Sequence, residues 1–415
     1  MRRIGVAERR ARLGLRHRLA AGARADGSSA DGPAEVARSL VAVHGTDPSS
    51  AYLGLLTRMD GGDIPAIGRA LYEDRSLIRL LGMRRTVFVT ALDIAPVIQA
   101  ACATGVAARE RRKLVSWLAE AEVAPDADGW LAEVEQAALT ALTKRGEATA
   151  AELARDDERL RTQIVLSRGK SYEGRVNLAS RVLLVLAAQG QVVRGRPLGS
   201  WSSHQYRWSP LTRWCPQGLP EWAVEAAEVE LARRWLRAYG PAMAEDLRWW
   251  AGWTKAQVRR ALAGLELVEV DLDGATGLVL ADDLEPAPAP PEPWAALLPG
   301  LDSTPMGWQQ RDWFLGQHGP RLFDGTGNVG PTLWWDGRIV GGWAQDRDGE
   351  IVCRFLEDAG ADAVAAADAA ARRLAGLLGG TRLAVRTRGP TWLERELAGG
   401  EPAPPRGERP APRAG

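Results

Sequence analysis

Apolar residues recur at three- and four-residue intervals on both sides of a short polar break near the N-terminus. The apolar positions are Val36, Leu40, Val43, Tyr52, Leu55, Leu56 and Met59. Their spacing predicts two amphipathic helices. The break reads His44-Gly45-Thr46-Asp47-Pro48, in which Gly45 ends the first helix and Asp47 before Pro48 is typical of a helix N-cap. An imidazole, a hydroxyl and a carboxylate therefore lie where two predicted helix ends meet.

The same pattern continues into a unit of three helices and a strand. A third helix is predicted over residues 66–72, after the N-cap Asp63. A further apolar run covers residues 76–81, and residues 84–90 are typical of a strand. This order of elements is typical of a winged helix.

Two further units follow the same plan. The second has predicted helices and strands over 130–144, 148–153, 177–189, 191–194 and 206–208. The third has them over 224–239, 244–250, 254–265, 267–272 and 277–280. The remaining chain is expected to form short strands and one alanine-rich helix, over 328–330, 332–336, 338–345, 351–356, 364–378 and, for a last strand, 381–386.

These elements predict an α+β fold, with three tandem winged helix-turn-helix domains followed by a C-terminal β-rich domain. The expected divisions are 1–115 for an N-terminal basic helix with the first winged helix, 116–215 for the second, 216–284 for the third, 285–295 for a proline-rich linker, 296–398 for the β-rich domain and 399–415 for a disordered tail. Whether the arginine-rich residues 1–25 dock on the protein or reach for a ligand stays open.

Composition narrows the class of protein. The 415 residues are 46% hydrophobic, enough for a large core, and the formal net charge of +1 does not by itself indicate a partner. No apolar run has the length of a membrane span or of a signal-peptide core, so we expect a cytoplasmic protein without membrane contact. The three cysteines and four histidines show no ligand spacing. We therefore expect no disulfide framework, no metal and no cofactor.

Several segments together resemble the AlkZ/YcaQ-like winged-helix DNA-binding superfamily. The segments are VAVHGTDPSSAYLGL over 41–55, residues 70–76 running into 83–89, the helix of Arg181 with 190–194, and 297–302 with 333–342. The resemblance spans nearly the whole chain. It implies three winged helices and a β-rich C-terminal domain, and characterised relatives are DNA glycosylases that remove alkylated or bulky purine adducts. Where relatives carry Gln-x-Gln or Gln-x-Asp, this chain has His44-Gly45-Thr46.

The polar break offers the groups that a monofunctional glycosylase needs. An N-alkylated purine already carries positive charge, so it leaves readily if a water is held near the anomeric carbon. Neutral His44 would accept the water's proton, Thr46 would share the water, and Asp47 would oppose the developing positive charge. In the competing interpretation Asp47 is only an N-cap, Thr46 only closes the turn, and His44 is a polar residue at a helix end.

Basic residues in all three units are candidates for DNA contacts. They are Arg69, Arg75, Arg79, Arg84, Arg85, Arg168, Lys170, Arg175, Arg181, Lys255, Arg259 and Arg260. On one concave surface they would neutralise phosphates and give salt-dependent affinity, whereas spread around the molecule they would only be solvated. The leading hypothesis is a monomer that binds double-stranded DNA and excises a modified purine. The alternatives are a non-catalytic DNA-binding protein that regulates or senses damage, and a scaffold for protein contacts alone.

Overall fold

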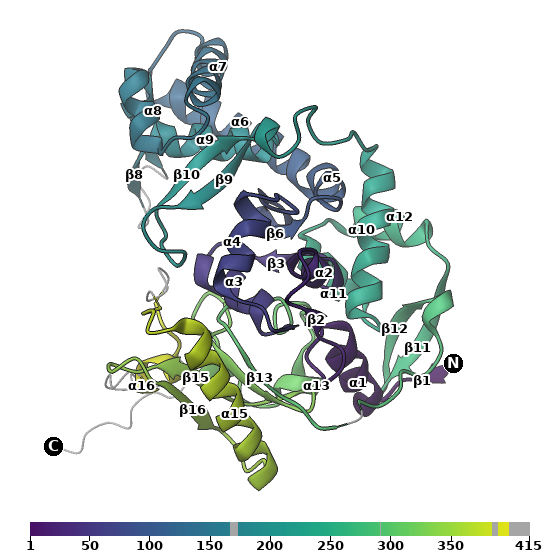
Figure 1. Cartoon of the computed structure of the whole chain (residues 1–415). Helices are drawn as coiled ribbons and strands as arrows, with labels where there is room; N and C mark the ends of the chain where they lie inside the picture. Colours follow the sequence, from purple (N-terminus) through teal and green to yellow (C-terminus); the bar gives the residue numbers. More distant parts are fainter. Residues whose placement is uncertain (167–172, 291, 384–388, 398–415) are drawn as a thin grey trace, which may run out of the picture.

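Residues 32–91, which include the polar break, lie at the centre of the molecule, with the other units arranged around them (Figure 1). The computed structural model describes residues 1–166, 173–290, 292–383 and 389–397. Helices and short, mostly antiparallel sheets are interspersed, which makes the fold α+β as predicted. Within the described residues, no helix has the length and apolar character to cross a membrane.

The arginine-rich N-terminus docks on the protein. Strand β1 (Arg2–Arg3) pairs in parallel with β11 (Leu267–Leu272), and helix α1 (Val6–Arg16) follows. Arg12 is 2% exposed and forms ion pairs with Glu8 at 2.9 Å and Asp283 at 3.3 Å. Arg16 pairs with the same Asp283 at 2.6 Å. The cluster of arginines thus stabilises the junction with the third unit, and this answers the question that the sequence left open.

The predicted helices around the polar break are confirmed, but their junction is not a plain helix–helix turn. The elements are β2 (Ala25–Asp26), α2 (Gly32–Ser39), β3 (Val43–His44), α3 (Pro48–Leu56), β4 (Met59–Asp60), α4 (Ile64–Tyr72), β5 (Leu77–Leu81) and β6 (Val87–Ala91). The first helix ends at Ser39, earlier than predicted, because Val43 and His44 pair with β6 in the sheet β3-β6-β5. Asp47 and Asp63 cap α3 and α4 as expected.

The predicted strand over 84–90 is wrong at its start, because residues 84 and 85 form the turn of the hairpin β5–β6. Arg84 and Arg85 have φ of 52° and 60°, and the Thr86 N–H donates to the Met83 carbonyl at 3.0 Å. Two consecutive left-handed residues and this hydrogen bond define a type I′ turn, so the strand begins only at Val87. Such turns favour Asn-Gly, and each non-glycine residue in this conformation costs roughly 1–2 kcal/mol. The backbone at the tip of the hairpin is therefore strained, and both strained positions are occupied by arginines.

The second unit contains a long helix that the hydrophobic pattern did not predict. Its elements are α5 (Ala95–Ile98), a wide helical turn (Gln99–Ala103), α6 (Thr104–Glu120), α7 (Ala127–Arg145), α8 (Ala150–Asp156), β7 (Gln163–Leu166), β8 (Gly174–Asn177), α9 (Leu178–Ala188), β9 (Val192–Pro197) and β10 (Tyr206–Pro210). Helix α6 runs through the expected division at residues 115 and 116. The helices over 127–156 and 178–188 and the hairpin β9–β10 match the expected order.

The third unit follows its prediction closely. It consists of α10 (Val224–Tyr239), α11 (Ala244–Ala251), α12 (Lys255–Ala263), β11 and β12 (Ala275–Leu280). Thr254 caps α12 through a reciprocal hydrogen-bond pair with Gln257, as its position before the helix predicted. Strands β11 and β12 pair antiparallel around the turn at Asp273 and Gly274.

The C-terminal unit is a four-stranded antiparallel sheet covered by helix α15. Its elements are β13 (Ala295–Leu298), α13 (Asp312–Leu315), α14 (Gly319–Leu322), β14 (Thr332–Trp335), β15 (Arg338–Gln345), β16 (Ile351–Phe355), α15 (Ala361–Leu378) and α16 (Trp392–Leu397). Strand β13 begins inside the expected linker, and residues 328–330 form only a single bridge, between Val329 and Phe323. Residues 381–383 are not a strand, and the rest of that expected strand and the tail after 397 lie outside the described residues.

A fully buried ion pair holds the C-terminal unit against the first unit. The Arg58 guanidinium donates to both carboxylate oxygens of Asp302, at 2.7 and 2.9 Å, and both side chains are 0% exposed. Arg58 also donates to the carbonyl of Gly54 at 2.6 Å and to the hydroxyl of Thr304 at 2.7 Å. Because its donors are satisfied, the charge is tolerated inside the core. The loop that follows β13 is thereby fixed beside the polar break.

His17 is buried next to the Arg58–Asp302 pair, and we expect it to make the fold sensitive to acid. Burial, and secondarily the nearby Arg58, lower the pKa of His17 well below its ordinary 6.5. Because His17 binds a proton more tightly in the unfolded chain than in the folded protein, its full contribution to stability is present above pH 6.5. This contribution is lost on acidification, by about 1.4 kcal/mol per pH unit. Urea unfolding of the wild type and His17→Gln at pH 7.5 and 5.5 measures this, and the variant is expected to lose less stability than the wild type. Equal losses would contradict the assignment.

Candidate functional site

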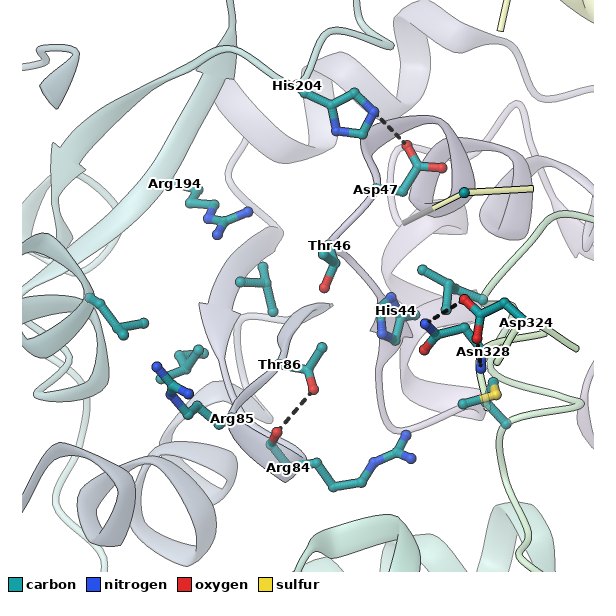
Figure 2. Close-up of a pocket in the computed structure, with 16 residues that line it drawn as sticks. His44, Thr46, Asp47, Arg84, Arg85, Thr86, Arg194, His204, Asp324 and Asn328 are labelled. Atoms are coloured by element: carbon teal, nitrogen blue, oxygen red, sulfur yellow. Dashed lines mark hydrogen bonds and ion pairs between the residues drawn. The ribbon is translucent and has the colours of Figure 1, made fainter. Parts of the chain in front are cut away.

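A pocket of about 360 Å³ opens at the polar break, and residues from all of the units except the third line it. Figure 2 shows His44 and Asp47 on one side of the pocket and Arg85 and Arg194 on the other, with Thr46 between them. The Arg84 side chain reaches below His44, and Asp324 and Asn328 lie beside His44 in this view. The remaining lining residues are Leu81, Thr86, Val87, Leu184, His204, Leu301, Met306 and Gly389. The volume falls within the range of small-molecule sites.

Strand pairing and the neighbouring loop fix the backbone of His44. His44 pairs with Phe88 in the sheet, and the two rings meet edge to face with centroids 5.3 Å apart. The His44 N–H donates to the Ser303 hydroxyl at 3.2 Å, and that hydroxyl donates to the Ala42 carbonyl at 3.0 Å. His44 is 6% exposed. The ring therefore lines the pocket from a rigid strand rather than from a flexible turn.

Arg79 supports the break from behind instead of facing DNA. It is 2% exposed, and its guanidinium donates to the Gly45 carbonyl at 2.6 Å. A phosphate cannot approach a side chain that is buried in this way. The prediction that Arg79 contacts DNA is therefore wrong, and its role is structural. The hydrogen bond holds the chain between His44 and Thr46, where both side chains reach the pocket.

Asp47 is an N-cap that also lines the pocket. Its carboxylate accepts hydrogen bonds from the Ser49 N–H at 3.2 Å and from the hydroxyls of Ser49 and Ser50, the latter at 2.8 Å. His204, from the connection between β9 and β10, places its Nε2 3.8 Å from an Asp47 oxygen (Figure 2). Sequence reasoning missed His204 because a lone histidine among serines carries no spacing signal. Both interpretations of Asp47, a cap and a pocket carboxylate, are compatible with this geometry.

Two arginines that line the pocket, Arg84 and Arg194, form cation–π contacts with aromatic rings. The Arg84 guanidinium lies 4.2 Å from the ring centre of Trp249, and the Arg194 guanidinium lies 4.5 Å from that of Tyr206. Burial lowers the pKa of both arginines to about 10, so both stay protonated at neutral pH. Arg85 forms an ion pair with Glu110 at 2.9 Å and remains partly exposed. Arg194 was not expected from the sequence, because it lies within a strand that reads as a packing element.

The other predicted DNA contacts lie in different surroundings. Arg75 donates to the Arg213 carbonyl, and Arg181 lies 5.9 Å from the ring centre of Trp117. Arg260 forms an ion pair with the buried Glu228. Four of the side chains are exposed and do not line the pocket, namely Arg69, Arg175, Lys255 and Arg259. Arg168 and Lys170 lie outside the described residues.

Metal-ligating and thiol groups do not gather in the described part of the chain. No cluster of three or more histidine, cysteine or carboxylate side chains is present there. Burial raises the pKa of Cys102 to about 12 and that of Cys353 to about 11, and it also raises the pKa of Cys215. These three thiols are therefore protonated at neutral pH, which makes them poor nucleophiles.

Comparisons with known proteins agree with the resemblance inferred from the sequence. A family model described as DNA glycosylase AlkZ-like matches residues 37–377. The solved structure of the DNA glycosylase AlkZ of Streptomyces sahachiroi is similar, with a TM-score of 0.69 and 22% sequence identity, over 92% of this chain and 99% of that chain. The sequence matches none of the functionally curated proteins. The length of the family match shows that the chain belongs to the AlkZ-like DNA glycosylase family.

Proposed function

We propose that the protein is a monofunctional DNA glycosylase that removes N-alkylated or bulky purine adducts from double-stranded DNA. The observation that carries the proposal is the pocket that His44 and Thr46 line together with three arginines, Arg84, Arg85 and Arg194. Membership of a DNA glycosylase family supports the reaction class. No cofactor enters the proposed chemistry.

The proposed reaction is hydrolysis of the bond between the purine and the anomeric carbon. The electron pair of the C1′–N9 bond moves into the cationic alkylated base, which leaves neutral. The oxygen of a water bonds to C1′, and the imidazole of His44 accepts the water's proton. Thr46 shares the water, while Asp47, close to His204, opposes the positive charge that develops on the sugar. The products are a free base and an abasic site.

The strained hairpin supports the proposed DNA contact. Arg84 and Arg85 occupy the left-handed positions of the turn at the edge of the pocket, where glycine or asparagine would relieve strain. A second cavity of about 270 Å³ shares both arginines, so the hairpin tip separates two hollows. We interpret the three units of helices and strands as winged helices that present this surface, and we propose that the protein acts as a cytoplasmic monomer.

Removing the positive charges of Arg84 and Arg85 is expected to make DNA binding depend less on salt concentration. Replacing both arginines by glutamine in Arg84→Gln/Arg85→Gln is expected to reduce the slope of log K against log salt by roughly 0.9 for each phosphate that is no longer neutralised. Titration of a labelled duplex at several salt concentrations measures the slope. Arg372→Gln on the exposed side of α15 is the matched control, with no change expected. A double variant that keeps the wild-type slope would remove the hairpin from the DNA interface.

A non-catalytic DNA-binding protein is the second candidate, because His44-Gly45-Thr46 stands in place of the glutamine motif of characterised relatives. The experiment that separates the two is release of free base from duplex DNA carrying 7-methylguanine or a bulkier N7 adduct. Release that leaves an abasic site supports the glycosylase. Tight, salt-sensitive binding of the adducted duplex without release supports the second candidate, and the absence of binding would contradict both.

A further inference from the structure

The side-chain amide of Asn328 is held in one orientation by two neighbours. Its Nδ2 donates to a carboxylate oxygen of Asp324 at 2.9 Å and to the Thr326 hydroxyl at 2.8 Å. That hydroxyl uses its own proton on the other Asp324 oxygen, at 2.8 Å, so towards Asn328 it only accepts. A flipped amide would place its carbonyl oxygen against two acceptors. The amide oxygen Oδ1 is therefore the group that Asn328 turns away from this network.

Asp324 anchors the network as a carboxylate. Burial alone would raise its pKa, but hydrogen bonds from Asn328 and Thr326 outweigh burial and lower the pKa. The backbone N–H groups of Thr326 and Asn328 donate to Asp324 as well, at 2.8 and 2.9 Å. The ionised group offers no proton to the Asn328 oxygen, so a flipped amide would place its oxygen against a bare carboxylate.

Asn328 and His44 line the same pocket although they lie far apart in the sequence. Figure 2 shows the Asn328 amide between Asp324 and the His44 ring in this view. An attacking water has two protons, and a general base receives only one of them. A second fixed acceptor is needed to orient the oxygen lone pair towards the carbon under attack. The hydroxyl of Thr46, next to His44 in the polar break, can rotate and therefore does not provide an acceptor with a fixed direction.

We infer that Asn328 supplies the second acceptor, through Oδ1, and positions the attacking water between the C-terminal unit and His44. This inference rests on the proposed glycosylase reaction. The proton that His44 does not take stays on the water oxygen and becomes the hydroxyl of the abasic sugar. Asp324 and Thr326 act through Asn328 and are positioning residues. The C-terminal unit thus completes the site that the N-terminal break begins.

The test is the competition between water and methanol for the sugar. The wild type is expected to give mainly the abasic hydroxyl product in a dilute water–methanol mixture, because the water is held. Asn328→Ala is expected to release base about 10- to 100-fold more slowly and to raise the share of methyl glycoside, while the dissociation constant of the adducted duplex stays within about twofold. A merely structural role would slow release without changing this share.

Two further variants keep the inference falsifiable. Thr326→Val frees the amide to flip while leaving Asn328 in place, so a smaller loss of rate and an intermediate methyl glycoside share are expected. Asn177→Ala, at the end of β8 and outside the pocket lining, is the matched control and is expected to behave as wild type. If the wild type releases base and neither Asn328→Ala nor Thr326→Val changes the rate and the product ratio, the inference is wrong and the glycosylase stands. If the wild type releases no base, the proposed function itself fails.

Discussion

His44→Ala is expected to lower the rate of base release by about 100-fold or more, because general-base catalysis contributes roughly 10²–10⁴-fold. The affinity for adducted duplex DNA should remain unchanged, since the arginines that line the pocket are untouched. The backbone of residue 44 keeps its strand pairing and its hydrogen bond to Ser303, so the loss reports on the imidazole rather than on the fold. Single-turnover release of 7-methylguanine, with the dissociation constant measured in parallel, gives both quantities.

His204→Ala is the matched control for that experiment. His204 lines the same pocket but lies next to the N-cap carboxylate of Asp47, so its removal should slow release far less than removal of His44. The reverse order of effects would make His204 the base and His44 a packing residue. Wild-type rates in His44→Ala would overturn the proposed mechanism, even if the protein remained a DNA binder.

Asp302→Ala is expected to reduce the free energy of unfolding by about 3–5 kcal/mol, which is a large part of the stability of an ordinary domain. The variant leaves the guanidinium of Arg58 charged at a site with 0% exposure and without its carboxylate partner. Urea unfolding followed by tryptophan fluorescence measures the change. Ser303, the next residue, accepts the His44 N–H, so loss of order in this loop should also slow base release.

The control for the buried pair is its replacement as a pair. Arg58→Met/Asp302→Leu removes both charges together, so it should recover most of the stability lost by Asp302→Ala, since isolated burial of the charge is the main cost. If the double variant were as unstable as the single one, the hydrogen bonds of Arg58 to Gly54 and Thr304 would be the larger contribution. If Asp302→Ala unfolded like the wild type, the pair would not hold the two units together.

The sequence determined the local elements and the family. Asp47, Asp63 and Thr254 cap helices where their positions before apolar repeats predicted, because a cap involves only the next three residues. The antiparallel strands 332–335, 338–345 and 351–355 were likewise predicted from alternation and turn residues. The motif at the polar break and the resemblance of distant segments indicated a DNA glycosylase relative, which the family match confirms.

Local patterns failed where long-range pairing competes with them. The break around His44 reads as a turn between helices, yet β3 forms there because β6 offers it a partner. Arg84 and Arg85 read as part of a strand, but closing the hairpin requires them in the turn. Pairing between segments cannot be read from either segment alone, since each is stabilised only by the presence of the other.

The pocket itself was decided by the tertiary structure. His204, Arg194 and Asn328 have no neighbours in sequence that mark them as functional, and only the packing of the units brings them to His44. The same packing buries Arg79 and leaves Arg84 at the opening, although both are arginines on one hairpin. Residue type and spacing determine which helices and strands form and what chemistry each can offer. Which of these groups meet, and which are removed from solvent, depends on contacts between residues far apart in the chain.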